Sequence, residues 1–409
     1  RSYSVTGVQT CALPISNRDG HVTTGDHVPT SLPAEIRQVW RITVGEGFSS
    51  PVVTGGKSTG TVFYMDLQED METVHAVEAA TGKELWQKPL DTAFKDGWGQ
   101  GPRCTPLVDG SRLFVQSCRG ELQCLSTESG KLLWRRNYVQ DFGAIFMGET
   151  GPAAGATRHG NTGSPLVTGN HLIAQAGGLQ GASLVCLTQL SGEVVWKSQD
   201  DTAGNAAPII AILGGVRQVV SFTATGLIAV DADDGRLLWR VPLNTRLGRH
   251  ATTPVVVDDL VIVGSYQLGL LAVKVTREQA DFKAELAWTS KELAPNFASP
   301  VAVAGYIYGV GPQRNVYCVE AVTGRLAWSQ SGLIHAAGER AFASFLVLGK
   351  NILLLNDSGE LVLFGANPDR FEAAGRTQAC GATWSSPAFA DGRLYLRDAR
   401  NLFCLELAP

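Results

Sequence analysis

Residues 81–86 read TGKELW, and the recurrence of this short stretch along the chain determines the fold. Its spacing, a glycine followed four residues later by a tryptophan, returns at Gly130/Trp134, Gly192/Trp196, Gly235/Trp239 and Gly324/Trp328. A run of β-forming residues precedes each glycine, as in residues 74–78 (VHAVE) and 227–231 (LIAVD). Self-similarity at a period of this length is typical of stacked or radial repeats.

A second landmark alternates with the tryptophans: a small residue, usually followed by proline, and then an apolar run. It occurs at Ser50-Pro51, Thr105-Pro106, Ser164-Pro165, Ala207-Pro208, Thr253-Pro254, Ser299-Pro300 and Ser386-Pro387, while Ser344-Phe345 fills the remaining place without proline. The chain therefore contains eight repeats, spaced about 48 residues apart.

Each repeat reads as four short strands joined by tight turns. In the second repeat, the apolar or alternating runs 105–108, 113–117, 122–126 and 132–136 are separated by Asp109-Gly110, Arg119-Gly120 and Ser129-Gly130. Pairs that end in glycine, between β-type runs, predict hairpins. Eight units of four antiparallel strands predict an all-β fold, an eight-bladed β-propeller.

The two ends of the chain are expected to close the ring together. The C-terminal repeat has three strands, at Ser386-Pro387 and at residues 393–397 and 402–407, and lacks the fourth strand that should carry a tryptophan. That strand is present near the start, at residues 38–41 with Trp40. Pairing the N-terminal strand with the C-terminal blade would also remove exposed sheet edges.

Three places depart from the repeat. The fifth repeat inserts about eight residues, 277–284, ahead of Trp288, and the seventh has Asn367-Pro368-Asp369 in place of Thr-Gly and no tryptophan near Arg376. The longest connection, residues 137–163, is rich in glycine and alanine. A connection of that length either covers an edge or serves a function.

Composition excludes several classes of function. The 409 residues are 44% hydrophobic and 18% charged, and the formal net charge is −4 without a long basic run, which argues against nucleic acid as a partner. The apolar runs are too short for a transmembrane segment. We expect a monomer.

The first fifteen residues are treated separately from the propeller. Residues 5–15 resemble the translated reading of a sequencing-library adapter, so we take 1–15 as a non-native segment and 16–409 as a single propeller domain. The native N-terminus, with any export signal, is then expected to be missing.

The pattern A-x-D/E-x-x-T/S-G-x-x-x-W resembles the tryptophan-docking repeat of the quinoprotein-type propellers. That family contains the pyrroloquinoline quinone (PQQ) dehydrogenases and non-enzymatic relatives that include barrel-assembly lipoproteins. The resemblance extends from about residue 17 to the end of the chain. It implies that seven tryptophans pack between adjacent blades: Trp40, Trp86, Trp134, Trp196, Trp239, Trp288 and Trp328.

The cysteines and a cluster of aspartates are expected to have structural roles and to bind no metal. Cys124, Cys186, Cys318 and Cys404 share one repeat position and are expected to be buried fillers, whereas one disulfide among Cys104, Cys118 and Cys380 is left open. There is no Cys-x-x-Cys pair, and the aspartates at 231, 233 and 234 lack EF-hand spacing. We predict no metal site.

A ligand would sit where the segments that lead into the innermost strands converge on the central channel. Besides Phe48, those segments carry nine candidate ligand-binding residues: Arg103, His159, Asn161, Asn205, Arg249, His250, Asn296, Arg340 and Trp384. Donors with aromatic neighbours suit an anionic ligand. The alternative is that these side chains bond to each other, to loop carbonyls and to water.

The resemblance leaves three functions open. Family members that bind PQQ often carry an adjacent cysteine pair, which this chain lacks, and a dehydrogenase would need calcium and an aspartate base, for which no residue here matches the family pattern. We therefore predict no catalytic residues and expect a non-enzymatic, periplasmic scaffold that binds a partner from the cell envelope or a small ligand. The alternatives are a PQQ-dependent oxidoreductase with bound calcium and a minimal pocket, and the sensor portion of a longer polypeptide.

Overall fold

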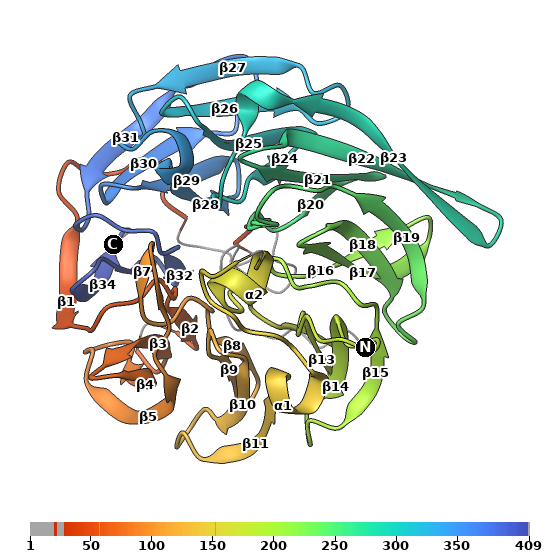
Figure 1. The fold of residues 1–409 in the computed structure, drawn as a ribbon. Coiled ribbons are helices and arrows are strands. Elements are labelled where there is room, and N and C mark those ends of the chain that lie inside the picture. Colours follow the sequence, from red (N-terminus) through yellow and green to blue (C-terminus); the bar gives the residue numbers. More distant parts are fainter. Residues whose placement is uncertain (1–19, 23–27, 57, 152, 408–409) are drawn as a thin grey trace.

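The computed structural model describes residues 20–22, 28–56, 58–151 and 153–407. In these residues the strands form eight four-stranded antiparallel sheets arranged as blades around a central axis (Figure 1). The eight-bladed propeller predicted from the repeats is therefore confirmed. The adapter-like residues 1–15 lie outside the described part of the chain.

The first four blades follow one another along the sequence. Their strands are β2 (Val52–Thr54), β3 (Thr61–Gln68), β4 (Met71–Glu78) and β5 (Glu84–Thr92); β8 (Leu107–Asp109), β9 (Arg112–Gln116), β10 (Glu121–Ser126) and β11 (Leu132–Asn137); β12 (Leu166–Thr168), β13 (His171–Ala174), β14 (Leu184–Thr188) and β15 (Val194–Ser198); and β16 (Ile209–Leu213), β17 (Val216–Thr223), β18 (Gly226–Asp231) and β19 (Leu237–Pro242).

The other four blades continue the ring. Their strands are β20 (Val255–Val257), β21 (Leu260–Ser265), β22 (Gly269–Glu278) and β23 (Asp281–Ser290); β24 (Val301–Val303), β25 (Tyr306–Gly311), β26 (Asn315–Glu320) and β27 (Leu326–Ser331); β28 (Ala343–Leu348), β29 (Asn351–Asn356), β30 (Glu360–Gly365) and β31 (Ala373–Gln378); and β32 (Ala388–Ala390), β33 (Arg393–Arg397), β34 (Asn401–Glu406) and β1 (Arg37–Thr43).

A few elements lie between the blades. They are a small hairpin of β6 (Lys95–Asp96) and β7 (Gly99–Gln100), the helices α1 (Tyr138–Phe142) and α2 (Gly155–His159), and the 3-10 helices η1 (Lys291–Leu293) and η2 (Gly338–Arg340). Both α-helices belong to the long connection between the second and third blades, and α2 lies beside the centre of the ring (Figure 1).

The eighth blade closes the ring with strands from both ends of the chain. β1 is antiparallel to β34, and Trp40 pairs with Cys404 across that junction. The buried Arg397, on β33, donates hydrogen bonds to the carbonyl oxygens of Met65 (2.9 Å) and Gly45 (2.6 Å), which joins the eighth blade to the first. The predicted pairing of the two ends is confirmed.

The docking tryptophans hold neighbouring blades together in a repeated geometry. Each indole nitrogen of Trp40, Trp86, Trp134, Trp196, Trp288 and Trp328 donates to a carbonyl oxygen in the turn of the next blade, at Ala79, Thr127, Gln189, Ala232, Ala321 and Asn367 respectively. In all of these turns except the one that Trp328 contacts, a glycine packs on the indole: a Cβ built on Gly130 would lie 2.6 Å from the ring of Trp86. This contact explains why glycine and tryptophan recur together.

Trp239 departs from this geometry, and the hairpin of the next blade is longer than its counterparts. The inserted residues of the fifth repeat lengthen β22 and β23 into a hairpin that extends beyond the ring (Figure 1). Trp239 packs in a cluster that includes Val273 and Val275 of this hairpin and donates instead to Oε1 of Gln218, at 2.7 Å. Trp239 therefore keeps its hydrophobic contact with the next blade, but its hydrogen bond is made within its own blade.

The seventh blade replaces its missing tryptophan with the N-terminal segment. Residues 28–36 run along β31, where the backbone nitrogen of Leu32 donates to the carbonyl oxygen of Ala374 at 3.1 Å. A Cβ on Gly375 would lie 2.7 Å from the backbone of Leu32. Leu32 thus covers part of the outer strand that has no indole of its own.

The seven described cysteines are buried and no disulfide joins any two of them, so the bridge that the sequence left open among Cys104, Cys118 and Cys380 is not formed. Cys124, Cys186, Cys318 and Cys404 each pair across the sheet with a docking tryptophan. Their role as small buried fillers is confirmed.

Candidate functional site

The segments that lead into the innermost strands meet on one face of the ring, which we call the channel face. There they enclose a pocket of about 200 Å³, to which each of the eight blades contributes at least one residue. The pocket lies where the sequence predicted a ligand site.

Six of the nine predicted ligand-binding residues line this pocket: Arg103, His159, Asn205, Arg249, Asn296 and Trp384. Phe48, singled out with them in the sequence, lines it as well. The arginines, asparagines and aromatic residues of separate blades are thus brought together by closure of the ring.

The other three predicted residues lie outside the pocket lining. His250 is fully buried, where its ring stacks on Phe222 with 4.1 Å between centroids and its Nδ1 lies 2.7 Å from the carbonyl oxygen of Thr223. Burial lowers the pKa of His250 to about 4, so at neutral pH it is an uncharged core residue. Asn161 is buried and its backbone bonds to Cys118. Arg340, in η2, is exposed.

Hydroxyl groups from the repeated Ser/Thr-Pro pairs form a belt beneath the pocket. Four backbone nitrogens each donate to the hydroxyl oxygen of another blade: Ser50 to Thr105, Thr105 to Ser164, Thr253 to Ser299, and Ser386 to Ser50. A buried N–H needs an acceptor, and these side chains supply one across the gap between blades. At these four junctions the hydroxyl residue ahead of a proline therefore joins neighbouring innermost strands.

One wall of the pocket is aromatic. Trp384 lies 5.8 Å from Phe48, 6.0 Å from Trp98 and 5.2 Å from Phe297, measured between ring centroids. Phe297 in turn lies 5.7 Å from Phe342. These five rings come from the segments that lead into the first, second, sixth, seventh and eighth blades, so ring closure assembles the wall.

A buried ion pair adjoins the aromatic wall. Asp96, on the hairpin β6–β7, receives two hydrogen bonds from the guanidinium of Arg103, at 2.6 and 2.8 Å, and its Oδ2 lies 3.2 Å from Nδ1 of His159. Burial would raise the pKa of Asp96, but the hydrogen bonds from Arg103 and His159 outweigh it and hold that pKa well below its usual value. Asp96 is a fixed anion at neutral pH and a weak base.

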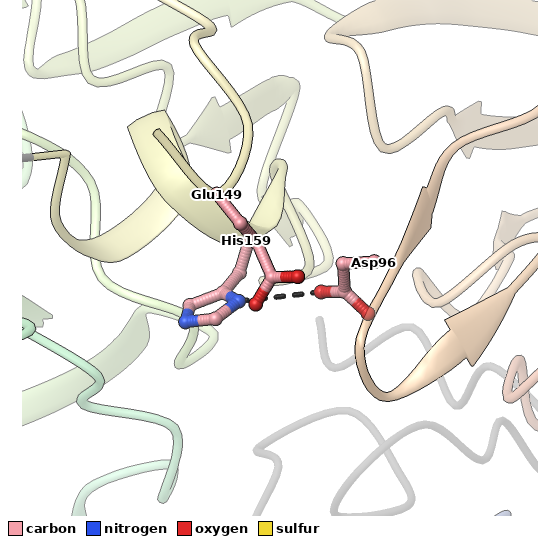
Figure 2. A group of neighbouring side chains, drawn as sticks. All are labelled: Asp96, Glu149 and His159. Atoms are coloured by element: carbon pink, nitrogen blue, oxygen red, sulfur yellow. Dashed lines mark hydrogen bonds and ion pairs between the residues drawn. The ribbon is translucent and has the colours of Figure 1, made fainter. Parts of the chain in front are cut away.

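Asp96, Glu149 and His159 could together hold a metal ion, since their ligand atoms lie within 4.8 Å of one another. Figure 2 shows the three side chains pointing toward a common centre, with His159 bonded to Asp96. Cations already face both carboxylates, however: Arg103 binds both oxygens of Asp96, and Arg158 lies 3.9 Å from Glu149. The cluster is therefore close to neutral and attracts a divalent cation weakly.

The second guanidinium of the pocket is also paired. Nη2 of Arg249 donates to Oε2 of Glu339, and its Cζ lies 5.1 Å from the ring centroid of Trp98. Asn296 donates through Nδ2 to the carbonyl oxygen of Glu339, at 2.7 Å. Arg249 thus packs on the aromatic wall while its charge is compensated.

Several pocket residues were not singled out from the sequence. Trp98, Phe297 and Phe342 complete the aromatic wall, and Asp96, which lies behind the lining and binds Arg103, was noted only as one acid among several. Trp98 lies in the extra hairpin between β6 and β7, outside the repeat pattern, so its position in the repeat gave no signal. Phe297 directly follows Asn296, and its aromatic character beside a candidate residue was the signal available.

The pocket offers no unpaired guanidinium to the carboxylates of the quinone cofactor suggested by the sequence resemblance. A cavity of about 150 Å³ holds a benzene molecule, whereas PQQ has three fused rings with three carboxylates and the pocket measures about 200 Å³. The two guanidiniums that line it, those of Arg103 and Arg249, are engaged by Asp96 and Glu339. The pocket has the size and the charge balance for a smaller, uncharged group.

Known proteins resemble the chain over most of its length. A sequence model of the family described as outer membrane protein assembly factor BamB matches residues 70–331. The factor of that name from Moranella endobia (strain PCIT) is 26% identical over 382 residues, which cover 85% of this chain and 86% of the relative.

Solved structures share the fold at lower sequence identity. BamB from Moraxella catarrhalis superposes with a TM-score of 0.60 at 16% identity, over 91% of this chain and all of the other. Quinohemoprotein alcohol dehydrogenase from Comamonas testosteroni gives a TM-score of 0.58 at 12% identity, over 91% of this chain and 77% of the other. Likeness at this level of identity concerns the fold alone. From the match over residues 70–331, the chain belongs to the BamB family of PQQ-like β-propellers.

Proposed function

We propose that this chain is a non-enzymatic scaffold of outer membrane protein assembly, which acts in the periplasm and binds a protein of the cell envelope at its channel face. Family membership supports the process, because the relatives carry the name of an outer membrane protein assembly factor. In the described residues, no helix has the length and apolar character needed to cross a bilayer.

The observation that carries the proposal is an apolar patch on the channel face, beside the second and third blades. It consists of Val139, Ile145, Met147 and Leu179, which are 45%, 50%, 48% and 50% exposed. A bridge between Ala144 and Gly178 ties the long connection to the turn that carries Leu179, so the patch rests on a fixed backbone. Exposed apolar side chains that gather in this way are characteristic of protein interfaces.

The position of the patch explains why the long connection between blades two and three exists. Tyr138 and Phe142 of α1 are buried and anchor the connection, whereas Val139 on the same helix faces solvent. Asn137 caps α1 through its side chain, which accepts from the backbone nitrogens of Val139 and Gln140. The connection is thus a built surface, and we assign it to partner binding.

Site-specific photocrosslinking in the native host tests the proposal. A crosslinking amino acid at Met147, on the channel face, is compared with one at Glu128, an exposed turn residue on the opposite face. We expect adducts with components of the outer membrane assembly machinery from position 147 and none from position 128. Equal labelling from both positions, or no envelope protein from position 147, would refute it.

A further inference from the structure

We infer that the channel pocket binds a single aromatic side chain that carries a hydrogen-bond donor, the indole of tryptophan or the phenol of tyrosine. The inference rests on the proposed function for the source of that side chain, a partner protein seated on the channel face. The residues that line the pocket and its volume indicate which kind of ring it accepts.

The aromatic wall selects a flat apolar group. Its five rings, Phe48, Trp98, Phe297, Phe342 and Trp384, form a continuous series in which neighbouring centroids lie 5.2–6.1 Å apart. Aromatic pairs at such distances gain from offset or edge-to-face contact beyond the area they bury. A sixth ring placed against this wall makes the same contacts, and an aliphatic group does not.

The size of the pocket suits one ring system. At about 200 Å³ the cavity exceeds the roughly 150 Å³ that accommodates benzene, and it suits a phenol or an indole. All eight lead-in segments contribute to its lining, and cross-blade hydrogen bonds of the hydroxyl belt fix several of them. The pocket is therefore preformed, and its shape does not depend on a bound guest.

The charges of the pocket do not select an anion. Arg103 is bound by Asp96 and Arg249 by Glu339, so each guanidinium already has a carboxylate partner. The faces of the same guanidiniums lie against rings, since Cζ of Arg103 is 5.6 Å from the centroid of Phe48 and Cζ of Arg249 is 5.1 Å from that of Trp98. Such stacked arginines extend an aromatic surface.

Two asparagines that line the pocket have unused acceptors. Nδ2 of Asn205 donates to Oγ1 of Thr162 at 3.1 Å, and Nδ2 of Asn296 donates to the carbonyl oxygen of Glu339 at 2.7 Å. These bonds fix the orientation of both amides, and each Oδ1 is buried without a hydrogen-bond partner. A buried acceptor without a partner is unfavourable. A small shift of the side chain that lets a guest N–H or O–H donate to Oδ1 therefore lowers the free energy of the complex. This requirement favours tryptophan and tyrosine over phenylalanine.

Binding of capped amino acids to the purified protein tests the inference by isothermal titration calorimetry. The probes are the N-acetyl amides of tryptophan, tyrosine and leucine, together with the 1-methylindole analogue of the tryptophan amide. We expect saturable binding of the tryptophan and tyrosine amides, no saturation by the leucine amide, and about fivefold weaker binding of the methylated analogue.

Two variants locate the binding. Trp384→Leu removes the central ring of the wall and should abolish binding, while Ile212→Ala, at a side chain that is 71% exposed, serves as the matched control. Asn296→Ala should remove the difference between the two probes, so that the variant binds the tryptophan amide and the methylated analogue with the same reduced affinity. Thermal melting checks that each variant is folded. Equal affinity for leucine and tryptophan amides, or tryptophan affinity unchanged in Trp384→Leu, would overturn the inference.

Failure of the inference is distinguishable from failure of the proposed function. If position 147 crosslinks to assembly components while no aromatic amide binds, the scaffold function stands and the aromatic site is refuted. If the amides bind and position 147 captures no envelope protein, a partner protein as the source of the ring is refuted.

Discussion

The indole nitrogen of Trp134 donates a 2.8 Å hydrogen bond to the carbonyl oxygen of Gln189 in the next blade. Gly192 packs on the same indole, since a Cβ there would lie 2.7 Å from the ring. We therefore expect Trp134→Ala to lower the free energy of unfolding by about 3–5 kcal/mol, and Trp134→Phe, which loses mainly the hydrogen bond, by about 1 kcal/mol. Urea denaturation measures both. The exposed neighbour Leu133 is the control, because its replacement by alanine should change stability by less than about 0.5 kcal/mol. A similar loss in all three variants would contradict the docking role.

Arg397 joins the last blade to the first, and its loss should loosen the closure of the ring. Arg397→Met removes the hydrogen bonds to Met65 and Gly45 and leaves buried carbonyl oxygens without donors. We expect a destabilisation of about 2–4 kcal/mol, measured by thermal or urea unfolding. Arg400→Met changes an exposed arginine of the adjoining turn and should have little effect. If both variants have the same melting temperature as the parent protein, Arg397 does not stabilise the contact between the two blades.

Glu72 predicts a dependence of stability on pH. Burial raises the pKa of this carboxyl from 4.5 to about 7, and its Oε1 has no hydrogen-bond partner. A folded pKa above the unfolded one means that the contribution of Glu72 to stability is complete below pH 4.5 and is lost as the pH rises through about 7. At about 1.4 kcal/mol per pH unit, the loss reaches about 3 kcal/mol in alkaline solution.

The variant Glu72→Gln should therefore be more stable than the parent protein at pH 8.5 and similar to it at pH 5. Unfolding by urea at the two pH values measures the difference. A variant that is destabilised equally at both would show that Glu72 is charged in the folded protein at neutral pH.

Asp96 is expected to stabilise the channel face through Arg103 and without a metal. Asp96→Asn leaves the buried guanidinium uncompensated, which should cost about 3–5 kcal/mol at pH 7. Because the pKa of Asp96 is lowered on folding, its contribution is complete above the ordinary value of 3.8 and declines as the pH falls below it. The difference between variant and parent should accordingly shrink at pH 3.

The same cluster gives a prediction on metal ions. Zinc or calcium added to the parent protein, or removed by a chelator, should leave the melting temperature unchanged, because Arg103 and Arg158 already face the carboxylates of Asp96 and Glu149. A saturable rise in the melting temperature with either ion, lost in Glu149→Gln, would instead establish a metal site.

The repeats made the fold predictable because each contains the residues that pack it against its neighbours. Each Gly-x-x-x-Trp stretch supplies a glycine turn that receives the indole of the preceding blade, as Gly130 receives Trp86, and an indole that packs on the next blade, as Trp134 does on the glycine turn at Gly192. The site was predictable only where it followed the repeat. Arg103 and Asn205 each stand three residues before the proline of their repeat and both line the pocket, whereas Trp98 enters from a hairpin outside the repeat.

Position in the repeat also failed to predict side-chain direction. His250 follows Arg249 directly, yet the arginine lines the pocket and the histidine stacks on Phe222 in the core. Two adjacent residues in a loop point to opposite sides, and the loop conformation that decides between them depends on contacts with the neighbouring blade. Such contacts between distant segments leave no local pattern in the sequence.

The central claim, that this propeller binds a partner and performs no quinone chemistry, is tested most directly by titration of the purified protein with PQQ in the presence of calcium. Thermal stability and dye-coupled oxidation of alcohols are followed together. The account predicts no saturable stabilisation and no turnover, because the pocket is small and both guanidiniums are already paired. Saturable stabilisation accompanied by alcohol oxidation would contradict it.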